Sequence, residues 1–270
     1  MTSFHVIAGA SDSLEHTRIR KIGVPDLFDA LKRGFEDFMI KPSHLVFLFL
    51  IYPIVGVVLA AWTSGNNALP LLFPLVSGFA LIGPFAAIGL YEISRRREAG
   101  MDTSWRHAFE IRRSPALPSI AAVGIMLFAI FIAWLLTAQL FYQMLFGSTP
   151  PVSISSFISE IFATGRGWTL IIVGHVIGFI FAVVVLCTTV IAFPLLLDRD
   201  VGAYEAIYTS VRVVLANPVT MAIWGLIVAV LLIIGSVPVF VGLAVVLPVL
   251  GHATWHLYRK VVEPPAKAAG

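Results

Sequence analysis

Charged side chains and cysteine are both scarce in this chain. Charged residues make up 12% of its 270 residues, about half of the share found in soluble globular domains, whereas 59% of the residues are hydrophobic. This balance excludes an ordinary soluble domain and indicates a protein that crosses a membrane several times. Because Cys187 is the only cysteine, a disulfide within the chain is excluded.

Sequence motifs for catalysis are missing as well. The chain has no phosphate-binding glycine loop, nucleophile elbow, His-Glu-x-x-His or Cys-x-x-Cys signature, so we expect no cofactor and favour a protein that is not an enzyme. The net charge of +3 comes with no nucleic-acid-binding motif, and we expect no nucleic acid partner. The apolar runs almost lack acidic residues, whereas proton- and sodium-coupled carriers usually place carboxylates near the membrane midplane.

The chain is instead rich in apolar runs, six of which reach the roughly 20 residues that a membrane-spanning helix needs. We expect spans at about 44–62, 69–91, 117–141, 169–193, 218–234 and 238–258. The predicted fold class is therefore all-α, a polytopic helical membrane bundle with six transmembrane helices. Residues 1–24 are predicted to be a flexible tail, 25–263 one membrane domain, and 264–270 a C-terminal tail.

The basic residues predict the orientation of these spans. Of the 18 Lys and Arg residues, all but Arg166 lie in the tails or loops on one side of the predicted membrane. By the positive-inside rule, both termini are expected to be cytoplasmic and residues 142–168 to face the outside. Apolar residues at helical spacing over 154–162 predict a short helix resting on that outer surface.

Two segments are predicted to form amphipathic helices on the cytoplasmic surface, over 26–40 and 203–216. Pro42 is expected to end the first, because proline disfavours helical geometry in the residue before it. In each helix we expect the larger apolar side chains to face inward and the charged ones, among them Asp37, to face water. The predicted inward residues are Leu27, Phe28, Leu31, Phe35 and Phe38 in the first helix, and Tyr204, Ile207 and Val211 in the second.

The surface helix and the span after it recur along the chain. Fourteen residues separate Phe28 from Pro42, and fourteen separate Tyr204 from Pro218. The pattern predicts three parallel repeats, each a surface helix followed by a two-span hairpin, at about 24–100, 101–201 and 202–263. Prolines late in the even-numbered spans are expected to kink those helices. The kinks either help the helices to pack or free carbonyl groups that could line a cavity. These prolines are Pro84, Pro194 and Pro248.

The densest group of polar residues lies near the end of the last apolar run. His252 and His256 are four residues apart, so they share a helix face on which two imidazoles could hold a metal ion, although no carboxylate or cysteine stands nearby in the sequence. The same turn is rich in the residue types that anchor a helix at the membrane interface, and polar contact with a partner protein is a third interpretation. The anchor residues are Trp255, Tyr258, Arg259 and Lys260.

One further histidine, His175, lies inside the predicted span 169–193. An ionisable side chain within a membrane is a candidate polar functional site. A histidine bonded to a neighbouring helix is the alternative interpretation.

Three stretches of the sequence resemble a family of uncharacterised bacterial integral membrane proteins, some of which are labelled cytochrome c oxidase subunits. They are KIGVPDLFDALKRGFEDF, AFPLLLDRDVGAYEAIYTSVRVVLANPVTMAIWGL and VLPVLGHATWHLYRK. The resemblance implies a bacterial inner-membrane location. Haem-copper catalytic subunits use several intramembrane histidines as ligands, whereas this chain has at most two well inside its predicted spans.

These observations together favour a structural or accessory component of a respiratory or envelope membrane complex. Its expected partners are the lipid bilayer and other membrane subunits. The first alternative is a small-solute transporter or channel with a path between the kinked even-numbered helices. The second alternative is a membrane enzyme, for which His252 and His256 are the candidate site.

Overall fold

The fold is built from helices, and a computed structural model describes residues 17–42, 70, 72–81, 83–104, 114–148, 154–237 and 240–264. Within these ranges there is no strand, only an isolated antiparallel bridge between Ile19 and Val262. The all-α class is therefore confirmed. The contacts divide the chain into two compact units, where the sequence predicted one domain. Unit 1 comprises Met1–Phe49, Pro84–Gly124 and Leu186–Gly270, and unit 2 comprises Leu50–Gly83 and Ile125–Val185.

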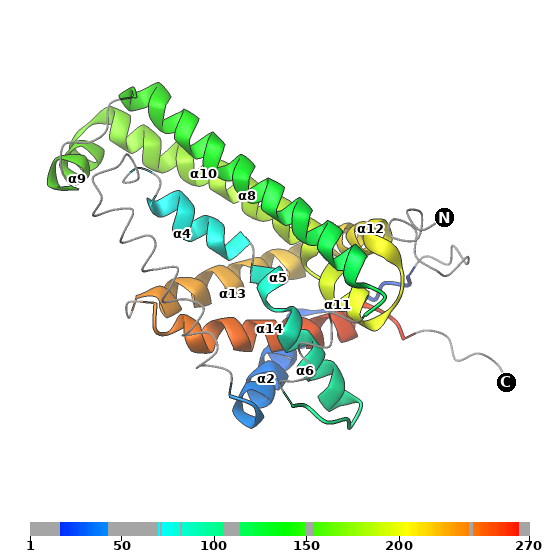
Figure 1. Ribbon diagram of the computed structural model, residues 1–270. Helices are drawn as coiled ribbons and strands as arrows, with labels where there is room; N and C mark the ends of the chain where they lie inside the picture. The colour runs from blue at the N-terminus through cyan, green and yellow to red at the C-terminus, as the bar shows by residue number, and fades with distance from the viewer. Residues whose placement is uncertain are drawn as a thin grey trace. The chain divides into compact units, whose positions relative to one another are not determined.

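Unit 1 is centred on α14 (Leu243–Val261), which lies beside α2 (Val24–Ile40) and α6 (Ile88–Glu98) (Figure 1). Glycines allow both contacts. A Cβ atom on Gly34 of α2 would lie 2.5 Å from the backbone nitrogen of Ala253, and one on Gly251 would lie 2.5 Å from a methyl carbon of Leu90 in α6. The two neighbouring helices therefore approach α14 more closely than larger residues at these positions would permit. The other helices of this unit are α11 (Ala192–Asp198), α12 (Gly202–Ala216) and α13 (Pro218–Ser236).

Helices α2 and α12 confirm the two predicted amphipathic segments. Of the side chains predicted to face inward, Leu27 and Phe38 are buried, but others are exposed. Phe28 is 60% exposed and Tyr204 is 63% exposed. The buried face of α2 contains its small residues Ala30 and Gly34, because small side chains let the backbone of α14 come close. The residues that α2 buries are Leu27, Ala30, Gly34, Asp37 and Phe38.

The chain just before α2 is fixed to unit 1, although it was predicted to belong to a flexible tail. The backbone amide of Arg20 donates to the carbonyl of Val261 at 2.8 Å, and the amide of Ile22 donates to the side chain of Asn217 at 2.9 Å. The hydroxyl of Thr220 donates to the carbonyl of Ile22 at 3.1 Å. Residues 19–22 thus connect the end of α14 with the start of α13.

Unit 2 contains α4 (Leu72–Leu81), α9 (Ile154–Ala163), and most of α8 (Leu117–Phe146) and α10 (Gly165–Thr189). Trp134 of α8 is buried where these helices meet: its indole nitrogen donates to the carbonyl of Pro74 at 2.8 Å, and its ring lies 5.5 Å from that of Phe181. Gly78 of α4 faces α8, where a Cβ atom would lie 2.6 Å from Phe131. Helix α9 confirms the predicted short helix.

Three segments in the described part of the chain are long and apolar enough to cross a membrane. They are Leu117–Phe146, Gly165–Asp198 and Pro218–Ser236, and they agree with the predicted spans at 117–141, 169–193 and 218–234. The predicted span 44–62 lies outside the described residues. The segment 69–91 is divided between α4, α5 (Gly83–Ala86) and α6, and 238–258 corresponds to α14, which is not among the three. Six spans and three repeats therefore stay predictions.

The three prolines expected to kink helices occupy different settings. Pro84 lies in the short helix α5, which a turn at Ala87 separates from α6. Pro194 lies in α11, and the break between α10 and α11 falls at Val190 and Ile191. This is where proline interferes with the carbonyl four residues earlier. Pro248 lies within the uninterrupted helix α14.

Candidate functional site

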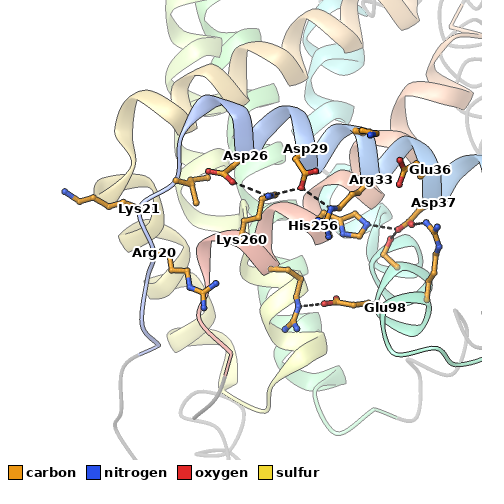
Figure 2. Close-up of a pocket in the computed structure, with 15 residues that line it drawn as sticks. Arg20, Lys21, Asp26, Asp29, Arg33, Glu36, Asp37, Glu98, His256 and Lys260 are labelled. Carbon is orange, nitrogen blue, oxygen red and sulfur yellow. Dashed lines mark hydrogen bonds and ion pairs between the residues drawn. The ribbon is translucent and has the colours of Figure 1, made fainter. Parts of the chain in front are cut away.

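Five polar side chains from three helices meet in unit 1, and we call this group the polar junction. Helix α2 supplies Asp37, α6 supplies Ser94 and Arg97, and α14 supplies His252 and His256. Figure 2 shows Asp37 and His256 facing each other across the contact between α2 and α14. The junction lies on the same side of α2 as Ala30 and Gly34, so the close approach of α14 brings its two histidines to Asp37.

Asp37 is the centre of the junction and is only 2% exposed. Its Oδ2 atom accepts hydrogen bonds from the hydroxyl of Ser94 and from Nε2 of His256 at 2.9 Å, and its Oδ1 atom accepts from the guanidinium of Arg97. Burial acts to raise the pKa of Asp37, but its hydrogen bonds with His256 and Ser94 act in the opposite direction, and the pKa is lowered. Asp37 is therefore held as a carboxylate.

The hydrogen bonds around Ser94 define the form of His252. Nδ1 of His252 lies 2.8 Å from the hydroxyl oxygen of Ser94. Because Ser94 has one proton and donates it to Asp37, Nδ1 of His252 must carry the proton shared with Ser94. The imidazole is fully buried, which favours its neutral form with an unprotonated Nε2. This atom makes no hydrogen bond that meets normal geometry within the described ranges.

This arrangement differs from a catalytic serine site. A nucleophilic serine is activated by a base that accepts its proton, whereas His252 donates to Ser94 and the hydroxyl proton points to Asp37. Ser94 is also buried. The residues in the described ranges include no group of three or more His, Cys, Asp or Glu side chains arranged to hold a metal ion. His44, the first residue of the predicted span 44–62, lies outside those ranges.

A cleft of about 830 Å³ opens at the junction. All junction residues except His252 line it, together with further acidic and basic side chains. Lys260 bridges Asp26 and Asp29 at 3.2 and 2.9 Å, and Arg259 pairs with Glu98 at 2.9 Å (Figure 2). The hydrogen bond from the side chain of Lys260 is the main cause of the lowered pKa of Asp29. Ion pairs thus continue from the junction along the contact between α2 and α14.

The structure places the four predicted interface anchors inside this network. Trp255 and Tyr258 are buried; the indole of Trp255 donates to Glu98 at 3.0 Å, and the phenol of Tyr258 donates to Asp198. Arg259 and Lys260 form the ion pairs described above. The polar atoms that we expected to contact lipid headgroups therefore have partners within the chain, because α2, α6 and α11 enclose the end of α14.

His175 is separate from the junction and belongs to unit 2. Its Nδ1 lies 2.6 Å from the carbonyl of Ile171, one turn earlier in the same helix, and its ring centre lies 5.2 Å from that of Phe73. The side chain is exposed within the chain. It is therefore bonded to its own helix, and its ring lies near an aromatic ring of α4, tilted from it by 40°.

Sequence reasoning found the two histidines but missed Asp37, Ser94 and Arg97. Asp37 was assigned to the water-facing side of its helix because it is charged. The missed signal was the spacing of Ala30 and Gly34, two small residues four apart, which marks a face where helices approach closely. Asp37 lies three residues after Gly34 and so shares this face.

The comparisons with known proteins cover part of the chain. Residues 72–198 match the model of a family described as "Predicted integral membrane protein (DUF2189)". No curated protein and no solved structure matches the chain. The match includes two of the three long apolar segments, and also Ser94 and Arg97 of the polar junction. Together with the apolar helices, it identifies the type of protein. The chain is an integral membrane protein. The helices of unit 1 that carry Asp37, His252 and His256 lie outside the matched region of this membrane protein.

Proposed function

We propose that the protein is a structural or accessory component of a membrane complex in the inner membrane of a bacterium, and that both of its termini are cytoplasmic. The observation that carries this proposal is the polar junction, whose side chains form hydrogen bonds with one another. Ser94, Arg97 and His256 donate hydrogen bonds to the single buried carboxylate of Asp37. His252 donates to the hydroxyl of Ser94. Such a group joins helices and leaves little polar chemistry for a substrate.

The setting of the junction supports the same proposal. Asp37, Ser94 and His252 come from three parts of the chain that are far apart in sequence, and their hydrogen bonds connect α2, α6 and α14. A buried charge is stable only when it is paired and hydrogen-bonded. The junction therefore supports a role in holding these helices in one arrangement, as a structural subunit requires.

Purification from native membranes in a mild detergent tests the proposed role. We expect a stoichiometric membrane partner that remains bound through size-exclusion chromatography. An Asp37→Ala variant that is inserted in the membrane but loses this partner would strengthen the connection to the junction. A homo-oligomer that encloses a water-filled cavity would contradict the accessory role and favour transport.

The proposed orientation and the three parallel repeats are supported by independent observations. All but one of the basic residues lie on the predicted cytoplasmic side, and α2 and α12 bury corresponding positions, such as Ala30 and Ala206. Reporter fusions at residues 110 and 265 should be active only on the cytoplasmic side, and activity on the exported side would contradict the orientation.

A further inference from the structure

We infer that α12 lies in the interface between membrane and water and inserts one apolar side into the lipid, at the level of the headgroups and upper acyl chains. We call this side the lipid stripe and define it as Tyr204, Tyr208 and Leu215 of α12 with Val219 at the start of α13. The inference concerns the lipid contact of one helix and does not depend on whether the protein is an accessory subunit.

The lipid stripe is a sharply defined surface. Tyr204 is 63% exposed and Leu215 is 73% exposed, whereas Ala206 and Val213 on the other side of the same helix are completely buried. The spacing of Tyr204, Tyr208 and Leu215 puts all three within a narrow sector of the helix. Helix α12 therefore has one side committed to the interior of unit 1, where it packs against α11, and an opposite side of large apolar residues.

The composition of the stripe fits the headgroup region. The rings of Tyr204 and Tyr208 are stacked, with centres 6.0 Å apart and planes inclined by 4°. The guanidinium carbon of Arg212 lies 5.6 Å from the centre of the Tyr208 ring. Tyrosine is enriched where the membrane meets water, because its ring is apolar and its hydroxyl can reach water or headgroups. The guanidinium of Arg212 also donates to the carbonyl of Thr17 at 3.3 Å, which holds its charge beside these rings.

The stripe continues into a helix that is itself long and apolar enough to span the membrane. One residue, Asn217, separates α12 from α13, and Val219 in the first turn of α13 is 71% exposed. Further along α13, Leu226 and Ile233 are also exposed. Because α13 must enter the membrane close to Pro218, the adjoining end of α12 is held at the membrane surface. The apolar sides of the two helices then meet the same lipid.

Helix α2 carries a comparable surface, which identifies lipid rather than a protein as the occupant. Phe28 and Met39 of α2 are both 60% exposed, and Phe28 stands at the same distance before Pro42 as Tyr204 does before Pro218. The exposed apolar side chains lie on two helices that pack against different neighbours, so whatever covers them must reach both helices. The bilayer surrounds a membrane protein laterally and can do so, whereas one protein partner covers one face.

Fluorescence quenching on the full-length protein tests this inference. A Cys187→Ser background removes the native thiol, and single cysteines are then introduced at Tyr204, Leu215 and Phe28 and labelled with bimane. Arg33→Cys is the matched control, because Arg33 is exposed on α2, lines the charged cleft and, five residues after Phe28, lies on another side of the helix. Each labelled protein is reconstituted into phosphatidylcholine–phosphatidylglycerol nanodiscs, after size-exclusion chromatography has shown that it is folded. Two quenchers are compared: a lipid with a nitroxide on its upper acyl chain, and iodide in the water.

We expect the labels at Tyr204, Leu215 and Phe28 to be quenched severalfold more by the nitroxide lipid than the label at Arg33. Iodide should give the reverse order. Strong iodide quenching at Tyr204 and Leu215, equal to that at Arg33, would overturn the inference by placing the stripe in water. Protection of these two labels from both quenchers would also overturn it, because the stripe would then be covered by protein.

Discussion

Helices α2 and α12 have the same spacing from the proline that follows them and bury corresponding positions. At one of these buried positions, however, they carry chemically different residues. Ala30 and Ala206 are completely buried at one pair of corresponding positions, and Phe28 and Tyr204 are exposed at the pair two residues earlier. Asp37 of α2 corresponds to Val213 of α12, and both are buried. The same place in a packed helix thus holds a polar junction in one case and an apolar contact in the other. The backbone arrangement alone does not require the junction, so its residues serve the particular contact of α2 with α14.

Removal of the carboxylate should have the largest effect on this contact. In an Asp37→Ala variant, Arg97 and His256 lose their common partner in a buried site, and we expect the free energy of unfolding to fall by about 3 kcal/mol. Denaturation with SDS in mixed micelles measures the change. The double variant Asp37→Ala, Arg97→Ala is the control. The substitution of Arg97 should cost less free energy of unfolding in the chain that already lacks Asp37 than in the wild type. Strictly additive losses would show that the two groups do not act together.

Enlargement of Gly34 should have the next largest effect, because it separates α2 from α14. A Cβ atom would lie 2.5 Å from the backbone of Ala253, which cannot move away as the tip of a side chain could. We expect Gly34→Ala to lower the free energy of unfolding by about 1–3 kcal/mol in the same assay. Gly83→Ala is a suitable control, because a Cβ atom there meets no atom within 4 Å. Equal stability of the two variants would contradict the close contact.

Acidification should weaken the junction of α2 and leave the corresponding position of α12 unaffected. The pKa of Asp37 is lower in the folded protein than its ordinary value of about 3.9. The stability that this lowered pKa contributes is therefore fully present above pH 4 or so, and it is lost as the pH falls through the folded-state pKa. Unfolding midpoints of the wild type and of Asp37→Asn, compared from neutral pH downward, should converge in acid. Parallel curves would contradict the assignment.

Loss of the outer ion pairs should have the smallest effect. Lys260 contacts Asp26 and Asp29 at the partly exposed end of the α2–α14 contact. We expect Lys260→Met to change the free energy of unfolding by no more than about 1 kcal/mol, because water screens such pairs. High salt should reduce the difference from the wild type further. A loss as large as that of Asp37→Ala would mean that the contact depends on its outer pairs and not on the junction.

The helices themselves could be predicted from the sequence, because the signals are local. The 3.6-residue pattern and Pro42 indicated α2, and continuous apolar runs indicated α8, α10 and α13. The inward faces of α2 and α12 could not be predicted in the same way. In a soluble protein a large apolar residue such as Phe28 would face the core, but in a membrane protein the surroundings can be apolar on both sides.

The meeting of Asp37 with His252 and His256 depends on a contact between distant parts of the chain. The sequence placed the histidines on one helical face and showed no carboxylate near them. Local spacing could not point to Asp37, which lies more than 200 positions from His256. Only the packing of α2 along α14 joins them. The burial of Trp255 and Tyr258 has the same origin, since neighbouring helices cover a turn that has the composition of a membrane anchor.

The contact between α2 and α14 also sets an order of events during biosynthesis. Among the described helices α2 is translated first and α14 last, so Asp37 must await its imidazole partners until nearly the whole chain has left the ribosome. During that interval α14 does not cover the face with Gly34 and Asp37, and Asp37 lacks the hydrogen bond from His256. A chain that stops before α14 keeps this face open permanently, which gives membrane quality-control proteases a direct means to recognise an incomplete product.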